Sequence, residues 1–147
     1  MSRSTHATSV RRTGIYPPLW SVVILVSAGT TIINLVIARI ATPLVHAPAD
    51  YPSFTWLPLL AGSLGGTVGG YLCFYLLSKF VSRPRAIFLI VATATLIFSY
   101  GLPVLPIINP LPRFAGVNWG IAYTLIGMHT VTAVLIVSSI LWRKPVP

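Results

Sequence analysis

Residues 120–142 read GIAYTLIGMHTVTAVLIVSSILW, a run that contains no carboxylate, lysine or arginine. A helix needs about 20 apolar residues to cross the hydrocarbon core of a bilayer, so this run is long enough to span one. Because lipid offers the backbone no hydrogen-bond partners, such a segment must satisfy its own amides as a helix. The run therefore predicts a transmembrane helix with a single histidine, His129, close to its middle.

The composition of the whole chain extends this prediction. Of its 147 residues, 55% are hydrophobic and only 7% are charged, and the mean hydropathy is +0.86. A soluble domain carries about 25% charged residues, because its surface faces water. The composition therefore predicts an all-α integral membrane protein whose outer surface faces lipid.

We expect four transmembrane helices, at about residues 19–40, 54–79, 85–104 and 118–142, within one domain that covers residues 18–144. Short connections make sequential helices antiparallel, which predicts an antiparallel four-transmembrane-helix bundle. The polar, basic residues 1–17 are expected to form a flexible cytoplasmic tail. Prolines predict loops at residues 41–53 and 101–116, and the second loop is so apolar that the bilayer surface or another chain should cover it.

The basic residues are distributed unevenly between the two sides of these helices. One side receives Arg3, Arg11, Arg12, Lys79, Arg83, Arg85, Arg143 and Lys144, and the other side receives only Arg39 and Arg113. The positive-inside rule then places both termini in the cytoplasm, which suits a multi-pass protein of the bacterial cytoplasmic (inner) membrane. Anionic lipids account for the net charge of +9, so we expect membrane lipids and no nucleic acid as partners.

Small and polar residues mark the faces by which the helices are expected to meet. Five glycines of the second helix share one face, which we call the glycine face: Gly62, Gly65, Gly66, Gly69 and Gly70. Each glycine costs about 1 kcal/mol in a helix interior relative to alanine, so this face indicates a close approach by another helix, a partner subunit, or a bound lipid or pigment. Asn34, Thr95 and Ser99 are expected to tie helices together by hydrogen bonds.

His129 allows more than one interpretation. An ionisable residue near the bilayer midplane is a candidate functional residue. It can be a neutral imidazole that bonds Asn34, Thr95 or Ser99, or it can contact a cofactor, since one imidazole is sufficient to hold the magnesium of a chlorin. No group of metal-ligating residues accompanies it, so no metal site is expected.

The chain has one acidic residue, Asp50, so it offers few titratable side chains for general acid–base catalysis. We therefore expect no enzymatic activity. We therefore expect a non-enzymatic accessory or structural subunit that packs into a larger membrane complex, respiratory or photosynthetic, with other membrane protein subunits as partners. The alternative is a binder or carrier of a quinone, carotenoid, chlorin or lipid, which would use His129 and the glycine face. A channel or transporter has less support, because few polar groups lie within the spans.

Two stretches carry a resemblance to a known family. Residues 76–99, LLSKFVSRPRAIFLIVATATLIFS, and residues 127–137, GMHTVTAVLIV, resemble an uncharacterised family of small bacterial four-helix membrane proteins, classed as a domain of unknown function. The matching motifs are the basic link Arg83-Pro84-Arg85 and the pair Met128-His129. The resemblance implies a four-helix topology and no established activity.

Overall fold

The computed structural model describes residues 19–110 and 112–142 and is helical, without strands, in these ranges. The long helices are α1 (Leu19–Leu44), α2 (Trp56–Phe80), α3 (Pro84–Ser99) and α5 (Trp119–Leu141), and a short α4 (Gly101–Ile108) extends α3. Two single-turn helices, η1 (Pro52–Phe54) and η2 (Pro112–Phe114), lie in the links. Four helical segments are long and apolar enough to cross a membrane, with α3 and α4 together as the third. The expected tail at residues 1–17, together with Arg143 and Lys144, lies outside the described residues.

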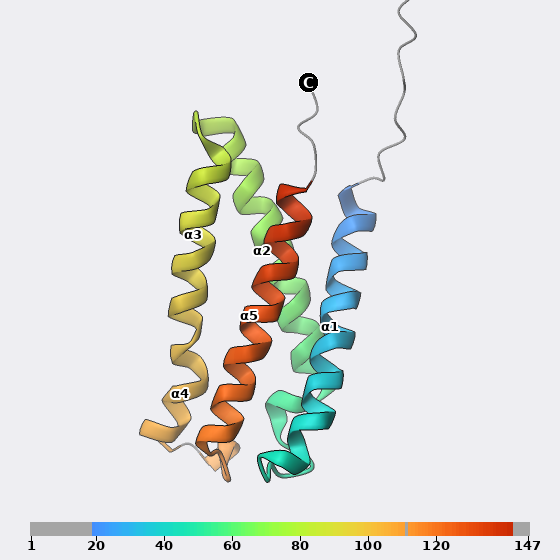
Figure 1. The fold of residues 1–147 in the computed structure, drawn as a ribbon, viewed down its shortest axis with the longest axis vertical. Helices are drawn as coiled ribbons and strands as arrows, with labels where there is room; N and C mark the ends of the chain where they lie inside the picture. Colours follow the sequence, from blue (N-terminus) through green and yellow to red (C-terminus); the bar gives the residue numbers. More distant parts are fainter. Residues whose placement is uncertain (1–18, 111, 143–147) are drawn as a thin grey trace, which may run out of the picture.

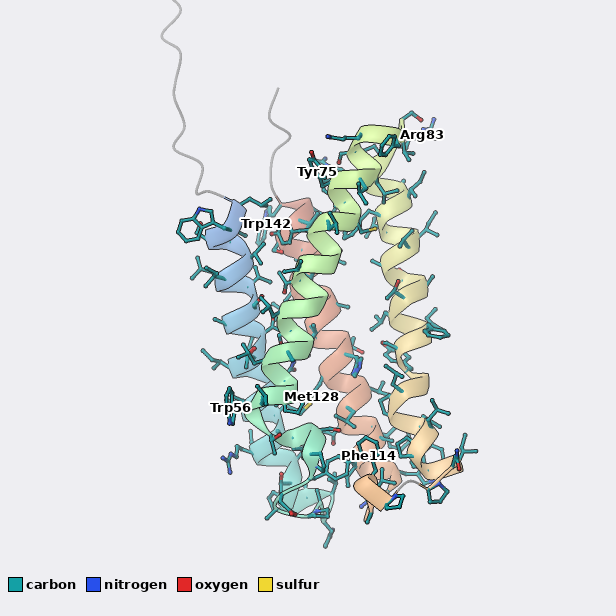
Figure 2. The ribbon with its side chains drawn as sticks, turned by 180° about the vertical axis from the view of Figure 1, so that it is seen from behind. Trp56, Tyr75, Arg83, Phe114, Met128 and Trp142 are labelled. Carbon is teal, nitrogen blue, oxygen red and sulfur yellow. The ribbon has the colours of Figure 1, made fainter. Side chains whose placement is uncertain are left out.

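The four segments lie side by side along one long axis (Figure 1). The chain descends along α1, rises along α2, descends along α3 and α4, and rises again along α5. The start of α1, the end of α5 and the turn from α2 to α3 therefore lie at one end of the molecule, and the two longer links lie at the other. Figure 2 shows Arg83 and Trp142 at the first end, and Trp56 and Phe114 toward the second.

The third segment differs from its expected bounds of 85–104. Helix α3 ends at Ser99, and α4 continues to Ile108 through residues that we expected to form a loop. The break between α3 and α4 follows from Pro103, which has no N–H to donate to the carbonyl of Ser99, four residues earlier. Tyr100 occupies the break, and its N–H is shared between the carbonyls of Leu96 and Ile97, four and three residues earlier, at 3.3 and 3.2 Å.

Helix α1 also continues past its expected end at residue 40, because Pro43 lies in its last turn and does not stop it. A proline costs one hydrogen bond in a helix, and that cost is small where the helix is about to end. The N–H of Val45 bonds the carbonyl of Ala41 at 2.9 Å, so the helical pattern resumes after Pro43. Helices α2 and α5 lie within two residues of the expected 54–79 and 118–142.

Helix α5 contacts α1, α2, α3 and α4, and among the described residues three hydrogen bonds between side chains connect it to its neighbours. Asn34 of α1 donates to Thr132 Oγ1 at 2.9 Å, and Tyr71 of α2 donates to Ser139 Oγ at 3.1 Å. The third bond, of 2.8 Å, joins the hydroxyls of Tyr100 and Thr130. Such bonds stabilise helix association in lipid by up to about 1–2 kcal/mol each.

Two apolar clusters lie at different heights of the bundle. One contains Ala38, Tyr51, Ile121, Leu125 and Met128, and the other contains Tyr71, Phe88, Ile136 and Ile140. Tyr51, in the link between α1 and α2, is 2% exposed and packs edge-on against Phe54 at 5.3 Å between ring centroids. Phe114 of the second link also contacts Tyr51, so the chain itself covers part of the apolar loop.

We predict that Gly70→Ala destabilises the protein by about 1–3 kcal/mol, because a methyl group there would lie 2.8 Å from Cγ2 of Ile136 and overpack the contact between α2 and α5. The matched control is Gly127→Ala, where a methyl group meets nothing within 4 Å and helix propensity favours alanine. Unfolding in detergent micelles, followed by circular dichroism, measures both. Equal stability of the two variants would contradict this packing.

Candidate ligand-binding cavity

A cavity of about 850 Å³ lies between α2, the α3–α4 segment and α5. Its lining is largely apolar and includes residues of both apolar clusters, such as Tyr51, Met128, Phe88 and Ile136. The cavity is partly open rather than fully enclosed. Small-molecule sites typically measure about 300–1,000 Å³ and are apolar with a few placed polar groups, so this cavity has the size and character of a ligand site.

The cavity exists because α3 packs loosely along most of its length. Phe88 is the one buried residue of this helix. The Phe88 ring meets Phe74 of α2 edge-on at 5.3 Å between centroids, and the Tyr100 hydroxyl bonds Thr130 just beyond the other end of the helix. Between these two contacts, residues at helical spacing line the cavity: Val91, Ala92, Thr95, Leu96 and Ser99.

The whole glycine face lines the cavity, but its residues divide into two sets. Gly66 and Gly70 pack against Ile136 of α5, where a methyl group would meet the isoleucine at 3.4 and 2.8 Å. At Gly62, Gly65 and Gly69, a methyl group would meet nothing within 4 Å. Close packing between helices therefore explains two of the five glycines, and the other three leave open space in the cavity.

Helix α5 contributes a stripe that contains His129. Leu125, Met128, His129, Thr132, Ala133, Ile136 and Val137 all line the cavity, at the spacing of one helical face. Sequence reasoning singled out His129 but did not include Thr132 or Ala133 among the candidate site residues. Counting three and four residues onward from His129 would have found both.

His129 does not bond the residues that were expected to hold it. Its Nδ1 lies 2.8 Å from the carbonyl oxygen of Leu125, one turn earlier on the same helix. A carbonyl only accepts, so Nδ1 carries the proton and donates it, and the lone pair of the neutral ring is on Nε2. Within the described part of the chain, Nε2 has no hydrogen-bond partner.

Of the three residues expected to tie helices together, only Asn34 bonds another helix within the described part of the chain, although all three line the cavity. Asn34 joins α1 to α5, but Ser99 donates to the carbonyl of Leu96 on its own helix at 2.7 Å. Thr95 has no hydrogen-bond partner among the described residues. Both residues lie on the cavity-lining face of α3, a helix on which only Phe88 is buried.

Tyr51 and Ser53 bring the first link to the cavity. Burial raises the pKa of the Tyr51 phenol, and the hydrogen bond with Ser53 acts in the opposite direction. Asn118 fixes this link against α5: its Nδ2 donates to the carbonyl of Val45 at 2.8 Å, and its Oδ1 caps the helix by accepting from the N–H of Ile121. The link is therefore held in place at the edge of the cavity.

Comparison with known proteins identifies the class to which the chain belongs. It matches a family of unknown function, DUF6069, over residues 15–144, and it is a member of that family. The expected resemblance to a family of unknown function is thereby confirmed, as is the presence of four long apolar helices. No curated protein and no solved structure matches the chain. Its helices and family together define a multi-pass membrane protein of unknown function.

We predict that Thr132→Val destabilises the protein by about 1–3 kcal/mol, because it leaves the buried Asn34 amide without a partner. Asn34→Leu should cost less, since it removes the amide together with Oδ1, which has no partner among the described residues. Unfolding titrations of both variants and of the double variant measure the difference. A larger loss in Asn34→Leu than in Thr132→Val would contradict the prediction.

Proposed function

We propose that the protein binds an apolar, membrane-soluble small molecule in the cavity between α2, α3–α4 and α5. The observation that carries this proposal is the convergence of the glycine face and His129 on one cavity of about 850 Å³. Quinones, carotenoids, chlorins and lipids are the classes of molecule that reach such a site from the bilayer. The proposed role is binding rather than catalysis, because the one acidic residue of the sequence, Asp50, does not line the cavity.

The three glycines without a packing role support this proposal. Gly62, Gly65 and Gly69 have open space where a side chain would lie, although alanine would stabilise the helix by about 1 kcal/mol at each position. A bound molecule that lies flat against the backbone of α2 explains why no side chain occupies that space. Contact with this ligand would offset the cost of the glycines.

A binding test follows from the same positions. In the variant Gly65→Leu/Gly69→Leu, two side chains occupy the cavity, and we expect at least a tenfold loss of the apolar molecules that co-purify with the protein in mild detergent. Mass spectrometry of organic extracts measures this loss. Gly29→Leu is the control, because Gly29 also has nothing within 4 Å but lies outside the cavity.

Ligand content that is equal in the wild-type protein, the filled variant and the control would contradict the proposal. Helix content by circular dichroism distinguishes lost binding from lost folding. Leucine favours helix formation over glycine, so the filled variant should remain helical.

We further propose that the helices insert as an antiparallel bundle in the bacterial cytoplasmic membrane, with both termini in the cytoplasm. Lys79, Arg83 and Arg85 surround the turn between α2 and α3, at the end where α1 starts and α5 stops (Figure 2). The amine of Lys79 lies over the ring of Tyr75, 4.7 Å from its centroid, as expected where a span meets the headgroups. The positive-inside rule supports a cytoplasmic location for this end.

Labelling of single cysteines tests this orientation in a Cys73→Ser background, which removes the one native thiol. A membrane-impermeant maleimide should label Asp50→Cys in intact bacterial cells, and it should label Ser82→Cys only after lysis. The reverse pattern would place the basic end outside and overturn the proposed orientation.

A second candidate function is that of an accessory subunit within a larger membrane complex, where lipids and other membrane proteins are the partners. The loose packing of α3 favours it, because Phe98 and Ile90 on this helix are 81% and 68% exposed. A partner helix against α3 would cover them. Native gels after mild-detergent extraction test this function, and a monodisperse monomer without co-purifying chains would exclude a stable complex.

A further inference from the structure

We propose that the cavity selects ligands that carry a hydroxyl group, and that Nε2 of His129 accepts the hydrogen bond from that hydroxyl. This inference rests on the proposed binding function and specifies the chemistry of the ligand's head group. It predicts that a phenol, quinol or sterol-like alcohol binds in preference to a matched molecule that offers only acceptor atoms.

The hydrogen bond that His129 makes to its own helix determines which atom is left for the ligand. Nδ1 donates its proton to the Leu125 carbonyl at 2.8 Å, so in the neutral ring Nε2 offers the cavity a lone pair and no proton. Turning the ring over would place a C–H against that carbonyl and lose the bond. The i−4 bond therefore leaves Nε2 as the acceptor of a side chain that lines the cavity.

A second polar group of the cavity, the hydroxyl of Ser99, also favours a ligand that donates a hydrogen bond. The hydroxyl proton of Ser99 is donated to the carbonyl of Leu96 at 2.7 Å, so its oxygen is available mainly to accept. Thr95 and Thr132 keep hydroxyl protons that no described residue accepts, and they can turn to either role. Two fixed acceptors, one on α3 and one on α5, therefore favour an occupant that donates.

The apolar surroundings increase the discrimination. Within the cavity, bulk water does not supply a hydrogen bond to a protein acceptor that meets an acceptor atom of the ligand. A donor on the ligand satisfies that protein acceptor. A ligand with a carbonyl or an ether in place of the hydroxyl leaves Nε2 unpaired and brings two lone pairs together. A difference of about tenfold in affinity is expected from one such hydrogen bond.

The test uses a long-chain para-alkylphenol and its methyl ether, which share a shape and differ in the donor. Both are titrated by calorimetry into the full-length protein in nanodiscs. We expect the wild-type protein to bind the phenol about tenfold more tightly than the ether. In His129→Leu the two affinities should become equal, and His129→Gln, whose amide oxygen also accepts, should restore part of the preference.

The matched control is His46→Asn, which replaces the histidine of the first link, outside the cavity, and keeps a residue that tolerates its positive φ of 52°. This variant should keep the full preference for the phenol. A preference that is unchanged in His129→Leu would assign the discrimination to other residues and overturn the inference.

The remaining outcomes separate this inference from the proposed function. Equal affinity of the wild-type protein for both probes overturns the hydroxyl preference and leaves the binding function standing. Binding of neither probe overturns both. A purified protein with a tetrapyrrole absorption band that His129→Ala abolishes would assign Nε2 to a metal, which overturns the inference while supporting the cavity as a ligand site.

Discussion

Helix α5 is the element on which the rest of the structure depends, because it contacts α1, α2, α3 and α4. Between helices in lipid, the hydrophobic effect offers little attraction, since the acyl chains are as apolar as leucine. Association must then come from close packing and hydrogen bonds. Helix α5 supplies both, through the contact of Ile136 with Gly66 and Gly70 and through the hydroxyls of Thr130, Thr132 and Ser139.

The uneven distribution of these contacts accounts for the cavity. Helices α1 and α2 pack closely with α5, and the residues they bury are mostly small and polar, such as Ser27, Thr31 and Thr67. Helix α3 contacts α2 through Phe88 near one end, and Tyr100, just beyond its other end, bonds α5. The middle of α3 packs less closely against the bundle. Tyr100, at the break in the helix, connects this segment to α5 through Thr130.

The two proposed functions use the same open side of the bundle and differ in what covers it. A small molecule would occupy the space beside Gly65 and Gly69, whereas a partner helix would also cover outward residues such as Phe98. His129 belongs to the first alternative, since it lines the cavity and its Nε2 has no hydrogen-bond partner among the described residues. The hydrogen-bonding role of Nε2 thus indicates which chemical class of ligand the cavity would bind.

The sequence alone was sufficient to predict four apolar helices, because the affinity of a segment for lipid depends on its own length and composition. It also indicated that the glycine face and His129 are unusual, since both interrupt an otherwise uniform pattern. Only the tertiary structure decided that these residues share a cavity, that Thr95 and Ser99 bond no other helix, and that Tyr51 is buried. Those outcomes depend on the distance between helices, which is set by contacts between residues far apart in the chain, such as Asn34 with Thr132 and Tyr100 with Thr130.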